Sequence, residues 1–317
     1  MKERLDENLL VNDETNFLEL IQILWSNKKL ILIVTSFFGI ASILIALSLP
    51  SKYTSEVLLT PAIKSSQGNS LLDQYGGFAS MAGIELPDGE ASKKDIALEI
   101  LNSRNFITNF INKRDILVDL MASVDWDPST NELIIDEDIY DVKSKKWVRE
   151  VSYPYTSKPS YQEAYEHWHK NIFVISKDKD KGFVKLSITH YSPFIAKNWL
   201  LWIVEDLNDH VRKNDIDEST KSLEYLYQEL ERVNYDELNT LLYNLIEEDI
   251  KVLSIANTKE EYIFKIIDPA IVPQEKSYPS RALICIIITF IGGIFICLYV
   301  LCRHYISPKK LNNSKTN

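Results

Sequence analysis

Two long stretches without an ionisable side chain dominate the hydrophobic pattern of this chain. They are residues 30–49, LILIVTSFFGIASILIALSL, and residues 282–301, ALICIIITFIGGIFICLYVL. A helix of that length rises about 30 Å, the hydrocarbon thickness of a bilayer. A buried core helix could explain one such stretch, but two at opposite ends of the chain favour membrane spans. Because 29 residues precede the first stretch, a cleaved signal peptide is disfavoured. We predict transmembrane helices over 30–49 and 282–302.

The basic residues beside the two spans predict the orientation of the chain. They are Lys28, Lys29, Arg303, Lys309 and Lys310. Positive side chains favour the cytoplasmic face, so segments 1–29 and 303–317 are expected in the cytoplasm. Arg281 opposes this rule but does not reverse the balance. Residues 50–281 are then expected outside the inner membrane, in the periplasm of a cell with two membranes.

The segment before the first span, NFLELIQILWSN, has a helical apolar face. Its apolar positions are Phe17, Leu20, Ile21, Leu24 and Trp25. Either this is an interfacial helix with Trp25 as its anchor, or the first span begins early. The pattern leaves both interpretations open.

The segment KYTSEVLLT, after the first span, alternates like a strand. The positions on one side of that strand are Tyr53, Ser55, Val57 and Leu59. Residues 93–114, KKDIALEILNSRNFITNFINKR, have helical spacing, and short strand-like pieces such as ELIID and KKWVREV follow. NIFVISKDKDKGFVKLSIT predicts a β-hairpin whose turn ends in Gly182.

Residues 194–258 form the long helical region of this prediction. Neither glycine nor proline occurs from 194 to 268, and Leu223, Leu226, Leu230 and Val233 follow a 3–4–3 heptad step. Leu238, Leu242 and Leu245 continue the stripe after a slip in phase. We expect one helix of about 90 Å, or two in series with a kink or cap at NDIDES, residues 214–219. Such a stripe needs neighbours, so these residues are candidate packing positions between identical copies.

The end of the soluble region reads EYIFKIIDPAIVPQEKSYPSR and is expected to return to the membrane. Its first part predicts a strand that pairs with residues 53–60. Pro269, Pro273 and Pro279 then make a stiff, non-helical lead over 268–281, because proline fixes φ and lacks a donor. Three glycines in the spans could allow close helix approach: Gly39, Gly292 and Gly293.

Composition and motif searches point away from catalysis. The net charge is −10, which disfavours a nucleic-acid surface. Cys285, Cys297 and Cys302 all lie in or beside the second span, so no zinc spacing exists. No phosphate-binding loop occurs, His167 and His169 lack an evident third ligand, and DEDIYD lacks the glycine of a calcium loop. We therefore expect no cofactor, no metal and no enzymatic activity.

Several segments together resemble the chain-length determinant family, the Wzz-type polysaccharide co-polymerases. They are LIQILWSNKKLILIVT, KYTSEVLLTPA, FASMAGIELP, ALEILNSRNFITNFI, GFVKLSITHYSPFIAKNWLLWIVEDLNDHVR, SLEYLYQEL and FKIIDPAIVPQEKSYPSRALI. The proline-rich lead is the most specific of these marks, although the family often carries more Lys, Arg and proline there. DIYDVKSKKWVRE and KPSYQEAYEHW look like its longer-loop members.

The resemblance implies an α+β membrane protein: two transmembrane helices flanking a periplasmic α/β base with a long projecting helix. It also implies a ring-like homo-oligomer that regulates O-antigen length in lipopolysaccharide, with the O-antigen polymerase and undecaprenyl-linked glycan as partners. Some relatives carry a cytoplasmic tyrosine kinase, which the 16 residues after residue 301 cannot form. Three alternatives remain: a capsule or exopolysaccharide co-polymerase, a two-span periplasmic sensor, and a glycan-cleaving enzyme with paired carboxylates.

Overall fold

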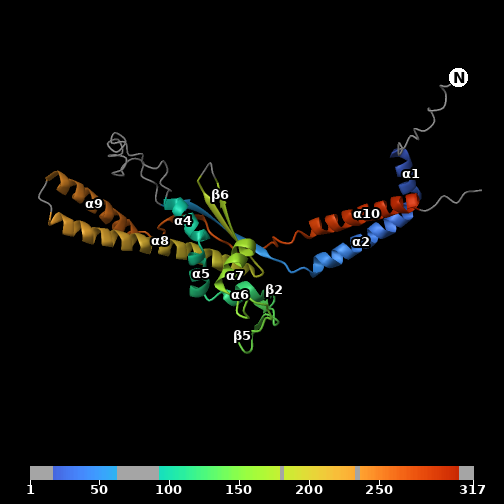
Figure 1. Cartoon of the computed structure of the whole chain (residues 1–317), viewed down its shortest axis with the longest axis horizontal. Coiled ribbons are helices and arrows are strands. Elements are labelled where there is room, and N and C mark those ends of the chain that lie inside the picture. Colours follow the sequence, from blue (N-terminus) through green and yellow to red (C-terminus); the bar gives the residue numbers. More distant parts are fainter. Residues whose placement is uncertain (1–16, 63–92, 179–181, 233–235, 307–317) are drawn as a thin grey trace, which may run out of the picture. The chain divides into compact units, whose positions relative to one another are not determined.

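The chain divides into two compact units, here called the membrane unit (residues 1–50 and 278–317) and the α/β unit (51–277). The computed structural model describes residues 17–62, 93–178, 182–232 and 236–306 (Figure 1). It confirms the predicted class, a mixed helix and sheet protein with two candidate membrane helices and a long helix.

The membrane unit consists of three helices. They are α1 (Phe17–Ser26), α2 (Lys28–Ser48) and α10 (Arg281–Ile306). Ile23 of α1 packs against Ile296 and Val300 of α10. The helix is interrupted at Asn27, which lies between α1 and α2. The segment before the first span is therefore a separate helix and not an early start of the span. Trp25 at its end is exposed and lies 5.3 Å from the Lys28 ammonium.

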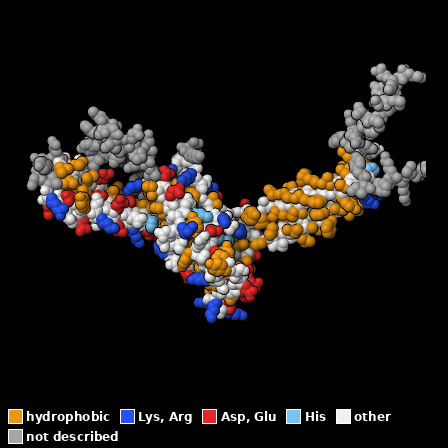
Figure 2. All heavy atoms as spheres, in the orientation of Figure 1, with side chains coloured by type: hydrophobic (Ala, Val, Ile, Leu, Met, Phe, Trp, Pro, Cys, Tyr) orange, Lys and Arg blue, Asp and Glu red, His pale blue; other side chains and the backbone are white. Residues whose placement is uncertain are grey.

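The outward faces of α2 and α10 are apolar. Phe37 and Phe290 are each 67% exposed, and hydrophobic side chains cover nearly the whole visible surface of these two helices (Figure 2). A core helix of a soluble protein would bury these side chains instead. Both helices are long and apolar enough to cross a membrane, in agreement with the two predicted spans.

The α/β unit is built on an antiparallel sheet of order β6–β7–β1–β8. Its strands are β1 (Tyr53–Pro61), β6 (Phe173–Lys177), β7 (Val184–His190) and β8 (Phe264–Asp268). The predicted β6–β7 hairpin is confirmed, and Gly182 has a φ of 72°, which favours glycine. The predicted pairing of the returning strand with the first one is also confirmed, since β8 pairs with β1.

One face of this sheet forms the core. The strand β1 buries Ser55, Val57 and Leu59, three of the four positions predicted for one side. They pack with β7 against the first turns of α8 (Pro193–Leu230), where Trp199 and Ile203 are buried. The apolar face of β1 and the apolar face of α8 pack against each other here, and each is thereby removed from water.

Shorter elements surround the sheet. The helical stretch 93–114 forms two helices, α4 (Lys93–Asn102) and α5 (Arg104–Lys113), because the Ser103 hydroxyl caps the second by accepting from Phe106 N at 3.2 Å. The remaining helices are α6 (Leu117–Ala122), α7 (Tyr161–His167) and the π-helical turn η1 (Trp168–Ile172). Two small hairpins pair β2 (Ser123–Asp127) with β3 (Glu132–Ile135) and β4 (Tyr140–Asp141) with β5 (Lys146–Trp147).

Candidate functional site

The most extended feature of the α/β unit is a helical hairpin formed by α8 and α9 (Asp236–Thr258). The hydroxyl of Ser192 accepts from Ile195 N at 3.4 Å, and Pro193 occupies the first turn, so the sequence fixes where α8 begins. With no glycine or proline to interrupt it, α8 continues for 38 residues. In Figure 1, α9 lies alongside the far half of α8.

The hairpin corrects our expectation of helices in series. The polar segment 214–219 neither kinks nor caps the helix; α8 ends at Leu230, and the chain reverses before α9. The slip in phase between Val233 and Leu238 marks that reversal, because two apolar stripes cover each other when the chain folds back. Val233 itself lies outside the described residues.

The leucine stripe is therefore covered within one chain. Leu226 is buried together with Leu242 and Ile246 of α9. Leu223, Leu230 and Leu245 pack around them, partly buried. The neighbour that the stripe needs is α9 of the same chain, so identical copies are not needed to cover it.

Large apolar side chains remain exposed on the outer faces of the hairpin. They are Tyr225, Tyr227, Leu238, Tyr243 and Ile250, with Tyr225 62% exposed and Tyr243 59% exposed. Two ion pairs lie along the hairpin, Arg232 to Glu229 at 3.0 Å and Lys251 to Glu247 at 2.6 Å. Exposed tyrosines beside fixed charges can contact another macromolecule and do not constitute a catalytic centre.

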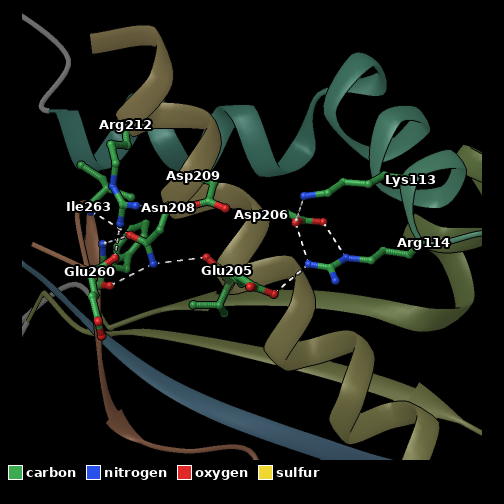
Figure 3. Close-up of polar contacts among 11 residues, drawn as sticks. Lys113, Arg114, Glu205, Asp206, Asn208, Asp209, Arg212, Glu260 and Ile263 are labelled. Carbon is green, nitrogen blue, oxygen red and sulfur yellow. Dashed lines mark hydrogen bonds and ion pairs between the residues drawn. The ribbon is translucent and has the colours of Figure 1, made fainter. Parts of the chain in front are cut away.

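A polar network joins the N-terminal half of α8, here called its root, to the C-terminal end of α5 (Figure 3). The Asp206 side chain, 6% exposed, accepts from Lys113 Nζ at 2.6 Å and from Arg114 Nη2 at 2.7 Å and Nε at 3.1 Å. Arg114 also reaches Glu205 at 2.7 Å. The hydrogen bond to Asp206 raises the pKa of Arg114, so this guanidinium stays charged. The planar fork of arginine suits this two-point contact.

The segment that leads into β8 packs against another side of the same part of α8. Asn208, buried within α8, accepts from Ile263 N at 2.8 Å and from Phe264 N at 3.1 Å through Oδ1. Its Nδ2 donates to Phe264 O and to Val204 O, both at 3.2 Å. One side chain thus satisfies four backbone groups, and Figure 3 shows it between α8 and the 260–264 segment.

A second link lies about two turns further along α8. Tyr262 donates from its hydroxyl to Asp215 Oδ2 at 2.5 Å, and Lys93 reaches the same oxygen at 2.9 Å. Burial and the hydrogen bond to Asp215 raise the pKa of Tyr262. Arg212 adds contacts to Asp209 and to the carbonyl of Glu260. These links clamp α8 between α4, α5 and the segment leading into β8, so the hairpin leaves the sheet at a fixed angle.

A groove of about 480 Å³ runs between α4, α8 and α9 above this root. Asp215, Glu218, Glu248 and Asp249 face it, together with Lys93. Within the described part of the chain, no group of three or more His, Cys, Asp or Glu side chains is placed to hold a metal ion. His167 ends α7 and His169 lies in the π-helical turn.

The proline lead is fastened to the edge of β1. Past Pro269, the carbonyl of Ile271 accepts from the Ser55 hydroxyl at 2.8 Å, and past Pro273, Ser277 N donates to Lys52 O at 2.9 Å. Pro279 belongs to the membrane unit and lies two residues before the start of α10. The lead is non-helical up to residue 280, as its prolines predict.

The three span glycines differ in how closely they meet the opposite helix. A Cβ at Gly292 of α10 would overlap the side chain of Phe38 in α2, whose own Cβ is 2.7 Å away. A Cβ at Gly39 would lie 3.7 Å from Thr289, and a Cβ at Gly293 would lie 3.9 Å from Thr35, which are ordinary contact distances. Within the membrane unit, Gly292 is therefore the position of close approach.

The clamp residues escaped the sequence analysis. Asp206 and Asn208 lie in EDLND, the polar end of NWLLWIVEDLND, so their immediate sequence gives no sign that they are buried. Their partners lie about 55 to 93 positions away in the chain, and nothing in a single sequence connects them.

Comparisons with known proteins bear on the family. Residues 13–114 match the family model described as Wzz, chain length determinant protein. A full-length bacterial polysaccharide co-polymerase is similar at 12% identity and a TM-score of 0.39, covering 94% of this chain and 100% of that one. A fragment of WzzB, a polysaccharide co-polymerase from Salmonella Typhimurium, is similar at 10% identity and a TM-score of 0.28, covering 72% and 100%.

No curated protein matches this chain. The matched region 13–114 includes the first membrane helix, β1, α4 and α5, and it contains four of the segments that carry the resemblance seen in the sequence. That resemblance is confirmed: through residues 13–114, this chain carries the pattern of the Wzz chain length determinant family.

Proposed function

We propose that this protein is a non-enzymatic regulator of O-antigen chain length in lipopolysaccharide, acting as an oligomeric scaffold beside the O-antigen polymerase in the inner membrane. The observation that carries the proposal is the family match over residues 13–114. The order of elements, two candidate membrane helices flanking a large α/β unit, supports it.

The proposed mechanism depends on shape. The α/β unit lies in the periplasm and both termini lie in the cytoplasm. The clamp around Asp206 and Asn208 holds the hairpin rigidly on the sheet, so the exposed tyrosines of the hairpin present a fixed surface. Copies that meet through this surface make a ring-like scaffold, and its dimensions bias how long a glycan grows on its undecaprenyl carrier before release.

The test is a deletion strain that keeps its polymerase and is complemented with variants. Without the gene, the lipopolysaccharide ladder should lose its modal band while polymer of random length remains. Leu226→Glu, which places a charge in the α8–α9 contact, should give the same ladder as the deletion. Lys221→Glu, an exposed charge change on the same helix, serves as the matched control and should restore the modal band.

Three outcomes would contradict the proposal. An unchanged modal band in the deletion strain would exclude a role in O-antigen length. A normal ladder with an altered length distribution of capsule or exopolysaccharide would move the activity to that polymer. Complete loss of polymer would assign the protein to synthesis and not to regulation.

A further inference from the structure

Three aromatic side chains from separate segments gather near the point where the chain enters the α/β unit. They are Tyr53 at the start of β1, Trp126 in β2 and Phe194 in the first turn of α8, here called the aromatic platform. The ring centroids of Tyr53 and Trp126 lie 5.7 Å apart at 84°, and those of Trp126 and Phe194 lie 6.2 Å apart. Phe194 is 43% exposed, and the other two are partly exposed.

The backbone holds the platform in place. Tyr53 pairs with His190 across β1 and β7, and α8 begins three residues after His190. Trp126 pairs with Leu133 across β2 and β3, and its indole N–H donates to Asn131 Oδ1 at 3.1 Å. The three rings of the platform are therefore held in place, and the indole N–H of Trp126 is already hydrogen-bonded to Asn131.

Chain length limits how far this platform can lie from the end of the first candidate span. Tyr53 follows the last residue of α2, Ser48, by five positions, so their Cα atoms are at most about 18 Å apart. Ser277 is hydrogen-bonded to Lys52 and Thr54, and α10 begins four residues after it. Both connections to the candidate spans thus leave the α/β unit at one place, next to Tyr53.

The chemistry of the platform suits the headgroup layer. Tryptophan and tyrosine concentrate at membrane interfaces because their rings partition there while a polar atom stays hydrated. Lys52 lies at the same place, 4.8 Å from the Tyr191 ring, and forms none of the ion pairs found among the described residues. Asp125 and Asp127 flank Trp126 but are engaged with backbone N–H groups of Trp126 and Ser129.

We propose that Tyr53, Trp126 and Phe194 rest in the headgroup layer of the bilayer that this chain's own helices cross, and so fix the tilt of the α/β unit. Two connections that leave from one place act as a single pivot. A separate contact of the platform with lipid removes that freedom, and the direction of the hairpin relative to the membrane is then set. This inference depends on the membrane spans and not on the polymer that the protein serves.

The test uses the full-length protein labelled with 5-fluorotryptophan in phospholipid nanodiscs. The fluorine signal that Trp126→Phe removes identifies Trp126, and Trp126→Tyr gives the same assignment if the first variant is not recovered. A lipid with a nitroxide near its headgroup should cause a loss of Trp126 signal intensity. Trp199, which is buried in the core, and Trp147, on the β5 hairpin, serve as internal controls and should keep their intensity.

A water-soluble gadolinium chelate separates the remaining outcomes. The proposal expects Trp126 to be protected from the chelate and attenuated by the lipid nitroxide. Attenuation by the chelate alone would show that the platform faces water and would overturn the proposal. Protection from both agents would overturn it as well, because the platform would then be covered by protein, such as a second copy of this chain.

Discussion

Replacing Asn208 with alanine should destabilise the α/β unit by about 3–4 kcal/mol. The substitution removes the only side-chain acceptor that the structure gives to Ile263 N and Phe264 N within the described residues, at 2.8 and 3.1 Å. A buried donor left without a partner costs about 1–3 kcal/mol. Two such donors, in a site where Asn208 is only 6% exposed, account for the expected loss.

The assay is urea unfolding of the full-length protein in mild detergent, followed by tryptophan fluorescence. Trp168 and Trp199 are fully buried in the core of the α/β unit and report its unfolding. Hydrogen exchange should show the same change locally, as faster exchange of the Ile263 and Phe264 amides. Asn257→Ala is the matched control, since Asn257 is exposed and its side-chain amide donates to Leu253 O, one turn away on the same helix; its effect should be within about 0.5 kcal/mol.

The reasoning is refuted if Asn208→Ala stays within about 0.5 kcal/mol of the wild type, the range of neutral surface substitutions. That result would mean that water replaces the side chain and that the clamp does not depend on Asn208. Equal losses in Asn208→Ala and Asn257→Ala would instead indicate a general effect on helices.

Three further predictions follow from burial and packing. Burial lowers the pKa of His190 from 6.5 to about 4, so on acidification the unfolded chain binds the proton before the folded chain does. The free energy of unfolding should therefore fall by about 3 kcal/mol between pH 6.5 and 4, measured by urea titrations at each pH. A His190→Gln variant that kept this pH dependence would contradict the assignment to His190. Leu226→Ala should cost about 2 kcal/mol and speed α9 amide exchange about 30-fold, whereas unchanged exchange would mean that α9 does not depend on this contact. Gly292→Ala should weaken the α2–α10 pair by about 1–3 kcal/mol in SDS titrations of helicity, while Gly293→Ala should not; similar behaviour of the two variants would count against the close approach to Phe38.

Much of the fold could be predicted because its signals are local. The two spans are long runs of uncharged side chains, β1 alternates, and the β6–β7 hairpin carries a glycine where φ is positive. The pairing of β8 with β1 was also predicted, because β1 follows the first span and β8 leads through the proline lead to the second. Each of these features depends on neighbouring residues or on the length of a connection.

The helical region shows where local reasoning ends. Its leucine spacing correctly identified packing positions, but the same spacing fits a stripe covered by another chain or by α9 of the same chain. The phase slip before Leu238 was visible in the sequence, yet only the folded chain shows that it is a reversal of direction.

The sequence by itself determined the membrane helices, the main strands, the proline lead and the family resemblance, since hydrophobic runs, periodicity and motifs do not require knowledge of distant contacts. The tertiary structure alone decided the hairpin, the clamp of Asp206 and Asn208, and the gathering of Tyr53, Trp126 and Phe194. The physical reason is that these contacts join residues from about 16 to more than 90 positions apart. Their energies arise only after the backbone has brought them together.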